Sequence, residues 1–141
     1  MRVAVLTSAE RGADLILDDA IAAVRGSCGR IAVLVVNEEF AVSYNFGGMP
    51  GALAAPIVRE DEPWPAAAVA RELVDRLPAD INATHAAFRS WRCPALLGQL
   101  RSGELDRVLL GDWPASILAR RKVVRATRTG GADLCAPPAL H

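Results

Sequence analysis

Polar residues that could bind a ligand follow four short apolar runs of the chain. They are Thr7 and Ser8, Asn37, Arg89, and Gly111 with Asp112 and Trp113. If the runs are parallel strands of one sheet, these residues lie at its carboxyl edge, where such sheets bind ligands at the point of reversal of the strand order. Helix caps and solvated turns use the same residue types, and Ser8 and Asp112 stand where N-caps are expected. Because of their place at the strand ends, all seven are candidate ligand-binding residues, with capping and turn formation as the alternative explanation.

The turn after the fourth run indicates what this edge could bind. It reads GDWPAS over 111–116. Phosphate sites at helix N-termini need glycines, because backbone N–H groups must approach the ligand closely. Here one glycine is followed by a carboxylate, a bulky indole and a proline that has no N–H. The turn after the first run, TSAERG, has no dinucleotide fingerprint either. The sequence predicts no glycine-rich phosphate site.

Catalytic and metal-binding patterns are missing from the sequence. His85 falls inside an expected strand, and neither it nor His141 has a cysteine, carboxylate or second histidine at a zinc-ligand spacing. The chain contains no G-x-S-x-G elbow, Walker loop or C-x-x-C motif. We expect a protein that is not an enzyme and that carries no metal or cofactor.

A basic cluster occupies the last expected helix. Its members are Arg120, Arg121, Lys122, Arg125 and Arg128. We interpret the cluster as the solvated face of an edge helix whose Ile117, Leu118, Val123 and Val124 face the core. Without interleaved aromatic residues it is a weak signal for nucleic acid, which is not an expected partner.

Strands and helices are expected to alternate along the chain. The β-branched and apolar runs predict strands at 2–7, 31–36, 81–88, 107–111 and 132–136. Helical periodicity, with proline and glycine boundaries, predicts helices at 13–24, 65–77, 94–102 and about 115–129. This order predicts a single α/β domain over 1–141, a three-layer sandwich with an open, mainly parallel five-stranded sheet of the Rossmann-like kind.

Composition sets limits on location and partners. The chain has 141 residues, no net charge and three widely spaced cysteines, and no stretch is apolar for long enough to span a membrane. These features predict a soluble cytoplasmic protein with reduced thiols.

The segment 39–62 is rich in glycine, proline and aromatic residues. It is expected to be a long loop that covers the domain's own sheet, a partner protein or a ligand.

The order of motifs resembles that of the universal stress protein family. RVAVLTS and AAVRG, then IAVLVVNEE, RELVDRLPADI, ATHAAFRSW, CPALLGQL and DRVLLG follow that plan over about 113 residues. The resemblance implies an adenine nucleotide alpha hydrolase-like fold and a homodimer. ATP-binding members carry an aspartate where this chain has Leu6-Thr7. Gly111 matches the first glycine of their phosphate loop, but Pro114 stands at the second, which implies a member that does not bind ATP in the family's manner.

These observations leave several functions open. The leading hypothesis is a non-catalytic, stress-protein-like module that acts through protein contacts in stress response or regulation. The alternative is a small-ligand or nucleotide sensor that uses the crevice at the strand ends, with Arg89, Asp112 and Trp113 under the 39–62 loop. A degenerate enzyme is the third. MRVAVLTS with IAVLVVN is also similar to the start of a folate-dependent formyltransferase, but that family's catalytic asparagine and histidine pattern is missing from LCAPPALH.

Overall fold

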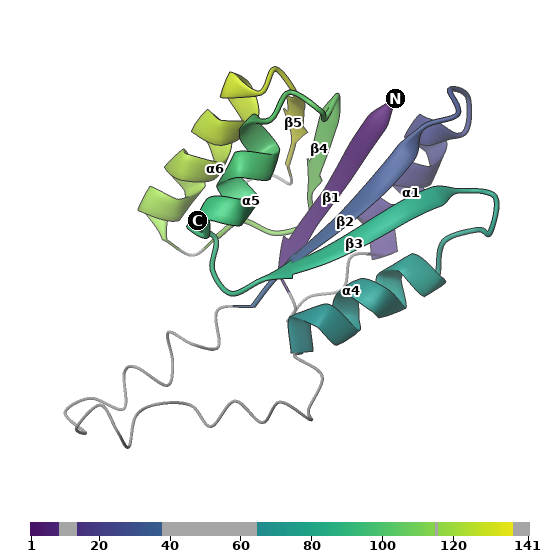
Figure 1. Cartoon of the computed structure of the whole chain (residues 1–141), viewed down its shortest axis with the longest axis horizontal. Helices are drawn as coiled ribbons and strands as arrows, with labels where there is room; N and C mark the ends of the chain where they lie inside the picture. Colours follow the sequence, from purple (N-terminus) through teal and green to yellow (C-terminus); the bar gives the residue numbers. More distant parts are fainter. Residues whose placement is uncertain (9–13, 38–64, 115, 137–141) are drawn as a thin grey trace.

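The chain alternates strands and helices around one sheet (Figure 1). A computed structural model describes residues 1–8, 14–37, 65–114 and 116–136. The strands are β1 (Arg2–Ser8), β2 (Arg30–Val36), β3 (Asn82–Phe88), β4 (Arg107–Leu110) and β5 (Asp133–Cys135). The described helices are α1 (Asp14–Val24), α4 (Pro65–Asp75), α5 (Pro94–Arg101) and α6 (Ile117–Thr129). Each lies within a few residues of the range predicted from the sequence.

The sheet is parallel throughout and has the order β3-β2-β1-β4-β5. The chain builds outward from β1 to β3 on one side, then returns to place β4 and β5 on the other. The strand order therefore reverses between β1 and β4. Along this junction Leu6 pairs with Leu110, and β1 continues beyond the last β4 pair to Ser8. The prediction of an open, parallel, Rossmann-like sheet is confirmed.

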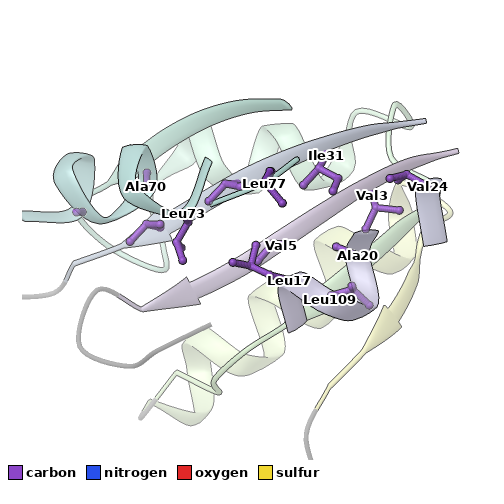
Figure 2. Close-up of a cluster of buried hydrophobic side chains, with 13 residues drawn as sticks. Val3, Val5, Leu17, Ala20, Val24, Ile31, Ala70, Leu73, Leu77 and Leu109 are labelled. Carbon is purple, nitrogen blue, oxygen red and sulfur yellow. The ribbon is translucent and has the colours of Figure 1, made fainter. Parts of the chain in front are cut away.

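Helices α1 and α4 cover one face of the sheet (Figure 2). Alternate residues of β1, Val3 and Val5, point to this face because successive strand residues face opposite sides. They pack with Leu17 of α1 and Leu73 of α4. Burying an aliphatic side chain of this size contributes about 1.5–3 kcal/mol. The apolar stripes that the sequence places on these helices are thus what attaches them to the sheet.

Helices α5 and α6 cover the opposite face, which completes the three layers. The intervening residues of β1, Ala4 and Leu6, belong to this second core. Leu100 of α5 and Val123 of α6 are buried in it. Because both faces are covered, the central strands are apolar at nearly every position, as the run RIAVLVV of β2 shows. The register of the sheet is fixed by two cores and not by one.

The structure also bears on the predictions made for the cysteines, for membrane spans and for the 39–62 segment. Cys28 and Cys135 are exposed free thiols, and Cys93 is half-buried. In the described part of the chain no helix is both long and apolar enough to cross a membrane. The 39–62 segment, predicted to cover the domain's own sheet, a partner protein or a ligand, lies outside the described residues, as does His141.

Candidate functional site

The candidate residues lie along the carboxyl edge of the sheet in the order that the strands impose. Arg89 follows β3, Asn37 follows β2, Ser8 ends β1, and Gly111 follows β4. Thr7 lies beside Gly111, at the point where the strand order reverses. Arg89 is not, because β2 and β1 separate β3 from β4 and neighbouring strands are about 4.8 Å apart. The predicted grouping of Arg89 with Asp112 and Trp113 would have to span about 14 Å.

Gly111 has a packing role at this junction. Its backbone N–H donates to the carbonyl oxygen of Leu6 over 2.8 Å. A Cβ at this position would lie 2.9 Å from Oγ1 of Thr7 and 2.7 Å from Cδ1 of Ile16. These distances are shorter than van der Waals contact, so any side chain at this position would force Thr7 or Ile16 to shift. The glycine that matches the family's phosphate loop is therefore explained by packing alone.

Two of the other candidates are too buried to meet a ligand directly. Thr7 has 0% of its surface exposed, and its hydroxyl donates to the Ser8 carbonyl oxygen at 3.4 Å. Asn37 is 5% exposed, and its backbone N–H donates to the Phe88 carbonyl oxygen at 2.9 Å. Both residues are thus part of the packed and hydrogen-bonded end of the sheet. Ser8 is half-buried, so it offers a more accessible polar side chain at this junction.

Two residues of the turn between β4 and α6 contact Arg120 of the helix. Pro114 is buried, and its carbonyl oxygen accepts a hydrogen bond of 2.6 Å from Nε of Arg120. The same guanidinium lies over the half-buried Trp113 ring, 6.0 Å from its centroid. Arg120 thus links the turn to the helix through a hydrogen bond and a cation–π contact.

The N-terminus of α6 is capped by a residue other than the one predicted. Oγ of Ser116 accepts from the backbone N–H of Ala119, so Ser116 is the N-cap and Asp112 is not. The prediction was wrong because the helix begins later than the strand end suggests. Ser8 is the last residue of β1, and the residues between it and α1 lie outside the described part of the chain, so its predicted role as a cap of α1 stays a prediction.

The outward face of α6 differs from the expectation. Ile117 and Leu118 were predicted to face the core, but 66% and 57% of their surfaces are exposed. The helix instead buries a narrow stripe made of Ala119, Val123, Ala126 and Thr127. Ile117 stands about 200° around the helix from Ala119. Hydrophobic type alone therefore placed the first turn wrongly. Val123 is buried as predicted, whereas Val124, also predicted to face the core, is only half-buried.

Two open hollows lie along α6. One, of about 530 Å³, runs from Trp113 along the helix and is also lined by Arg120, Arg121, Val124, Arg125, Arg128 and Thr129. We call the hollow lined by these seven residues the α6 groove. The other, of about 720 Å³, lies between α6 and β5 and shares Trp113, Val124 and Arg128 with it. The sequence identified the arginines and Trp113 separately, but only the fold places the indole at the end of the arginine row.

The described residues contain no group of three or more histidine, cysteine, aspartate or glutamate side chains that could hold a metal ion. When the chain is compared with protein-family models, no model matches it, and a comparison with curated proteins finds no match. The observations thus define the protein at the level of its fold class, an open parallel α/β sheet of the Rossmann-like kind.

Proposed function

We propose that this chain is a universal-stress-protein-like, non-catalytic module that does not bind ATP in that family's manner and acts through protein contacts. The observation that carries the proposal is the turn between β4 and α6. A phosphate group in this fold would need backbone N–H donors from that turn and from the helix N-terminus. Pro114 has no N–H, and Ser116 already accepts from the Ala119 N–H.

Other features of the same junction support the proposal. The carboxylate of Asp112 would repel a phosphate placed at the turn. Trp113 and Arg120 occupy the turn in a mutual contact. The strand order 3-2-1-4-5 is the Rossmann order without its sixth strand, in which ligands usually bind between the ends of β1 and β4, and the residues at that position do not suit a nucleotide.

The sensor hypothesis has less support. It requires Arg89 to act with Asp112 and Trp113, and the sheet order separates Arg89 from them by two strands. It also counted Thr7 and Asn37 among the ligand-binding residues, and both side chains are buried.

The ATP part of the proposal is tested by thermal unfolding with and without millimolar ATP and magnesium. A ligand present at a hundred times its dissociation constant raises the unfolding free energy by about 2.7 kcal/mol. We expect the melting temperature with ATP to match that with inorganic triphosphate at the same magnesium concentration. A rise that saturates with ATP and not with triphosphate would contradict the proposal.

The proposal includes a cytoplasmic homodimer. Strand β5 has three residues and lies at the sheet edge, so pairing through it alone would give few backbone hydrogen bonds. We expect dimerisation through a larger surface. Sedimentation equilibrium over a range of protein concentrations measures the mass directly; a monomer mass at every concentration would remove the homodimer from the proposal.

A further inference from the structure

We propose that the α6 groove binds an acidic protein segment that carries apolar side chains between its carboxylates. This inference rests on the proposed function, since it names the surface and the chemistry of the protein contact. It starts from the charge of α6, whose thirteen residues include four arginines, one lysine and no carboxylate. Arg121, Lys122, Arg125 and Arg128 are exposed. The nearest carboxylates in the sequence are Asp112 and Asp133, one beyond each end of the helix.

The groove joins these cations to apolar surface. Val124 lies between Arg121 and Arg128 in the lining, and Trp113 lies at one end. Arg120 is held there by its hydrogen bond to the Pro114 carbonyl oxygen and by the indole. A side chain that is already fixed loses less conformational entropy when a ligand arrives. Tryptophan and arginine are also the residues that contribute most often to binding energy at protein interfaces.

The first turn of α6 extends the apolar part of this surface. Ile117 and Leu118 are the large hydrophobic residues with the greatest exposure in the described chain, and they stand on the same helix as the exposed arginines. Aliphatic side chains of a bound protein segment could pack on them. The helix therefore presents apolar contacts at its N-terminal end and cationic contacts along its length.

These features favour an acidic protein segment over the other polyanions. Four of the five cations are arginines, whose planar guanidinium groups match carboxylates in bidentate geometry. Single-stranded nucleic acid is bound on several stacked aromatic side chains, and the groove has only Trp113, which Arg120 covers. A helix that lies in a membrane surface inserts a continuous apolar face, whereas the exposed large hydrophobic residues of α6 are confined to Ile117 and Leu118 in its first turn.

The test uses three fluorescent probes and the full chain. They are a short peptide of glutamates with leucines at helical spacing, a single-stranded oligonucleotide, and vesicles that contain phosphatidylserine. We expect the peptide to bind with a dissociation constant of about 10–100 μM, as measured by fluorescence anisotropy, and to bind more weakly in high salt. A peptide with serine in place of leucine should bind at least about tenfold more weakly if the apolar surface takes part.

Charge reversal locates the site. Arg121→Glu with Arg125→Glu changes two exposed side chains of the groove and should weaken peptide binding by at least about tenfold. The matched control, Arg71→Glu with Arg92→Glu, makes the same change in net charge at exposed positions outside the groove and should bind as the wild type does. Circular dichroism and the melting temperature establish that both variants are folded. Ile117→Ser with Leu118→Ser should weaken binding of the leucine peptide but not of the serine peptide.

Several outcomes would overturn the inference. They are no peptide binding up to about 1 mM, tighter binding of the oligonucleotide or the vesicles, and equal effects of the two charge reversals. The first and third remove the site, and the second assigns it to another class of partner. Each of these outcomes can be told apart from a failure of the proposed function. A melting temperature that rises specifically with ATP would show that the β4–α6 turn binds nucleotide, but it would not change the peptide measurements.

Discussion

At the scale of single residues, Gly111 shows how one position supports two explanations. The sequence placed it correctly at the end of β4, where a phosphate loop would have its first glycine. The structure adds that a Cβ there would collide with Thr7 and Ile16. No sequence pattern could have indicated this contact, because Thr7 lies more than a hundred residues away in the chain. The packing role needs no ligand.

Gly111→Ala should therefore destabilise the fold. The added methyl group meets Thr7, a fully buried strand residue that cannot move aside easily, and overpacking of this kind costs about 1–3 kcal/mol. Urea unfolding measures the change. Gly98→Ala is the matched control, since its Cβ would have no atom within 4 Å on the exposed side of α5. That control should be stabilised by about 0.5–1 kcal/mol. Equal effects at the two glycines would refute the packing role.

Cys28 gives a second prediction at this scale. It lies in the turn that joins α1 to β2 and has a φ of 52°. Among the described residues, it is the non-glycine residue whose φ is positive. A side chain in this left-handed region costs about 1 kcal/mol, which glycine avoids. Cys28→Gly should raise the unfolding free energy by about 0.5 kcal/mol after the greater entropy of the unfolded chain is subtracted. A loss of stability in urea unfolding would show that the thiol makes a favourable contact.

At the scale of elements, α6 marks the limit of reading periodicity by hydrophobic type. The sequence predicted the helix and its basic residues, and it placed Val123 in the core. It failed for Ile117 and Leu118, because the sheet and α5 accept a stripe that includes the small Ala119 and Ala126. Only the position of α6 against its neighbours decides which side of such a helix is buried. The exposure of the first turn of α6 could therefore not be predicted from the sequence.

The beginning of α6 provides the test at this scale. Ser116→Ala removes the acceptor of the Ala119 N–H, and loss of such a cap costs about 0.5–2 kcal/mol. We expect the low end of that range, since the hydrogen bond is 3.4 Å long. Ser116→Asp keeps an acceptor and adds a charge that is favourable at a helix N-terminus, so it should match the wild type in thermal unfolding. If Ser116→Ala leaves the stability unchanged, another residue must cap the helix.

At the scale of the whole molecule, the fold class could be predicted but the site could not. Alternating apolar runs and amphipathic helices require a parallel sheet with helices on both faces, and that is what forms. The order of the strands is set by the crossovers and not by any local pattern. It decides that Gly111 stands beside Thr7 and that two strands, β2 and β1, separate Arg89 from Asp112. The candidate residues were therefore located along the chain but could not be grouped in space.

The most direct test of the central claim is a titration of the isotopically labelled protein with ATP and magnesium, followed by amide NMR. The reporters are the Gly111 amide and the Trp113 indole N–H, which belong to the β4–α6 turn, with a Trp113→Phe variant to assign the indole signal. We expect neither signal to move at millimolar ATP by more than it does with inorganic triphosphate. Saturable shifts at both reporters, specific to ATP, would contradict the proposal and make this junction a nucleotide site.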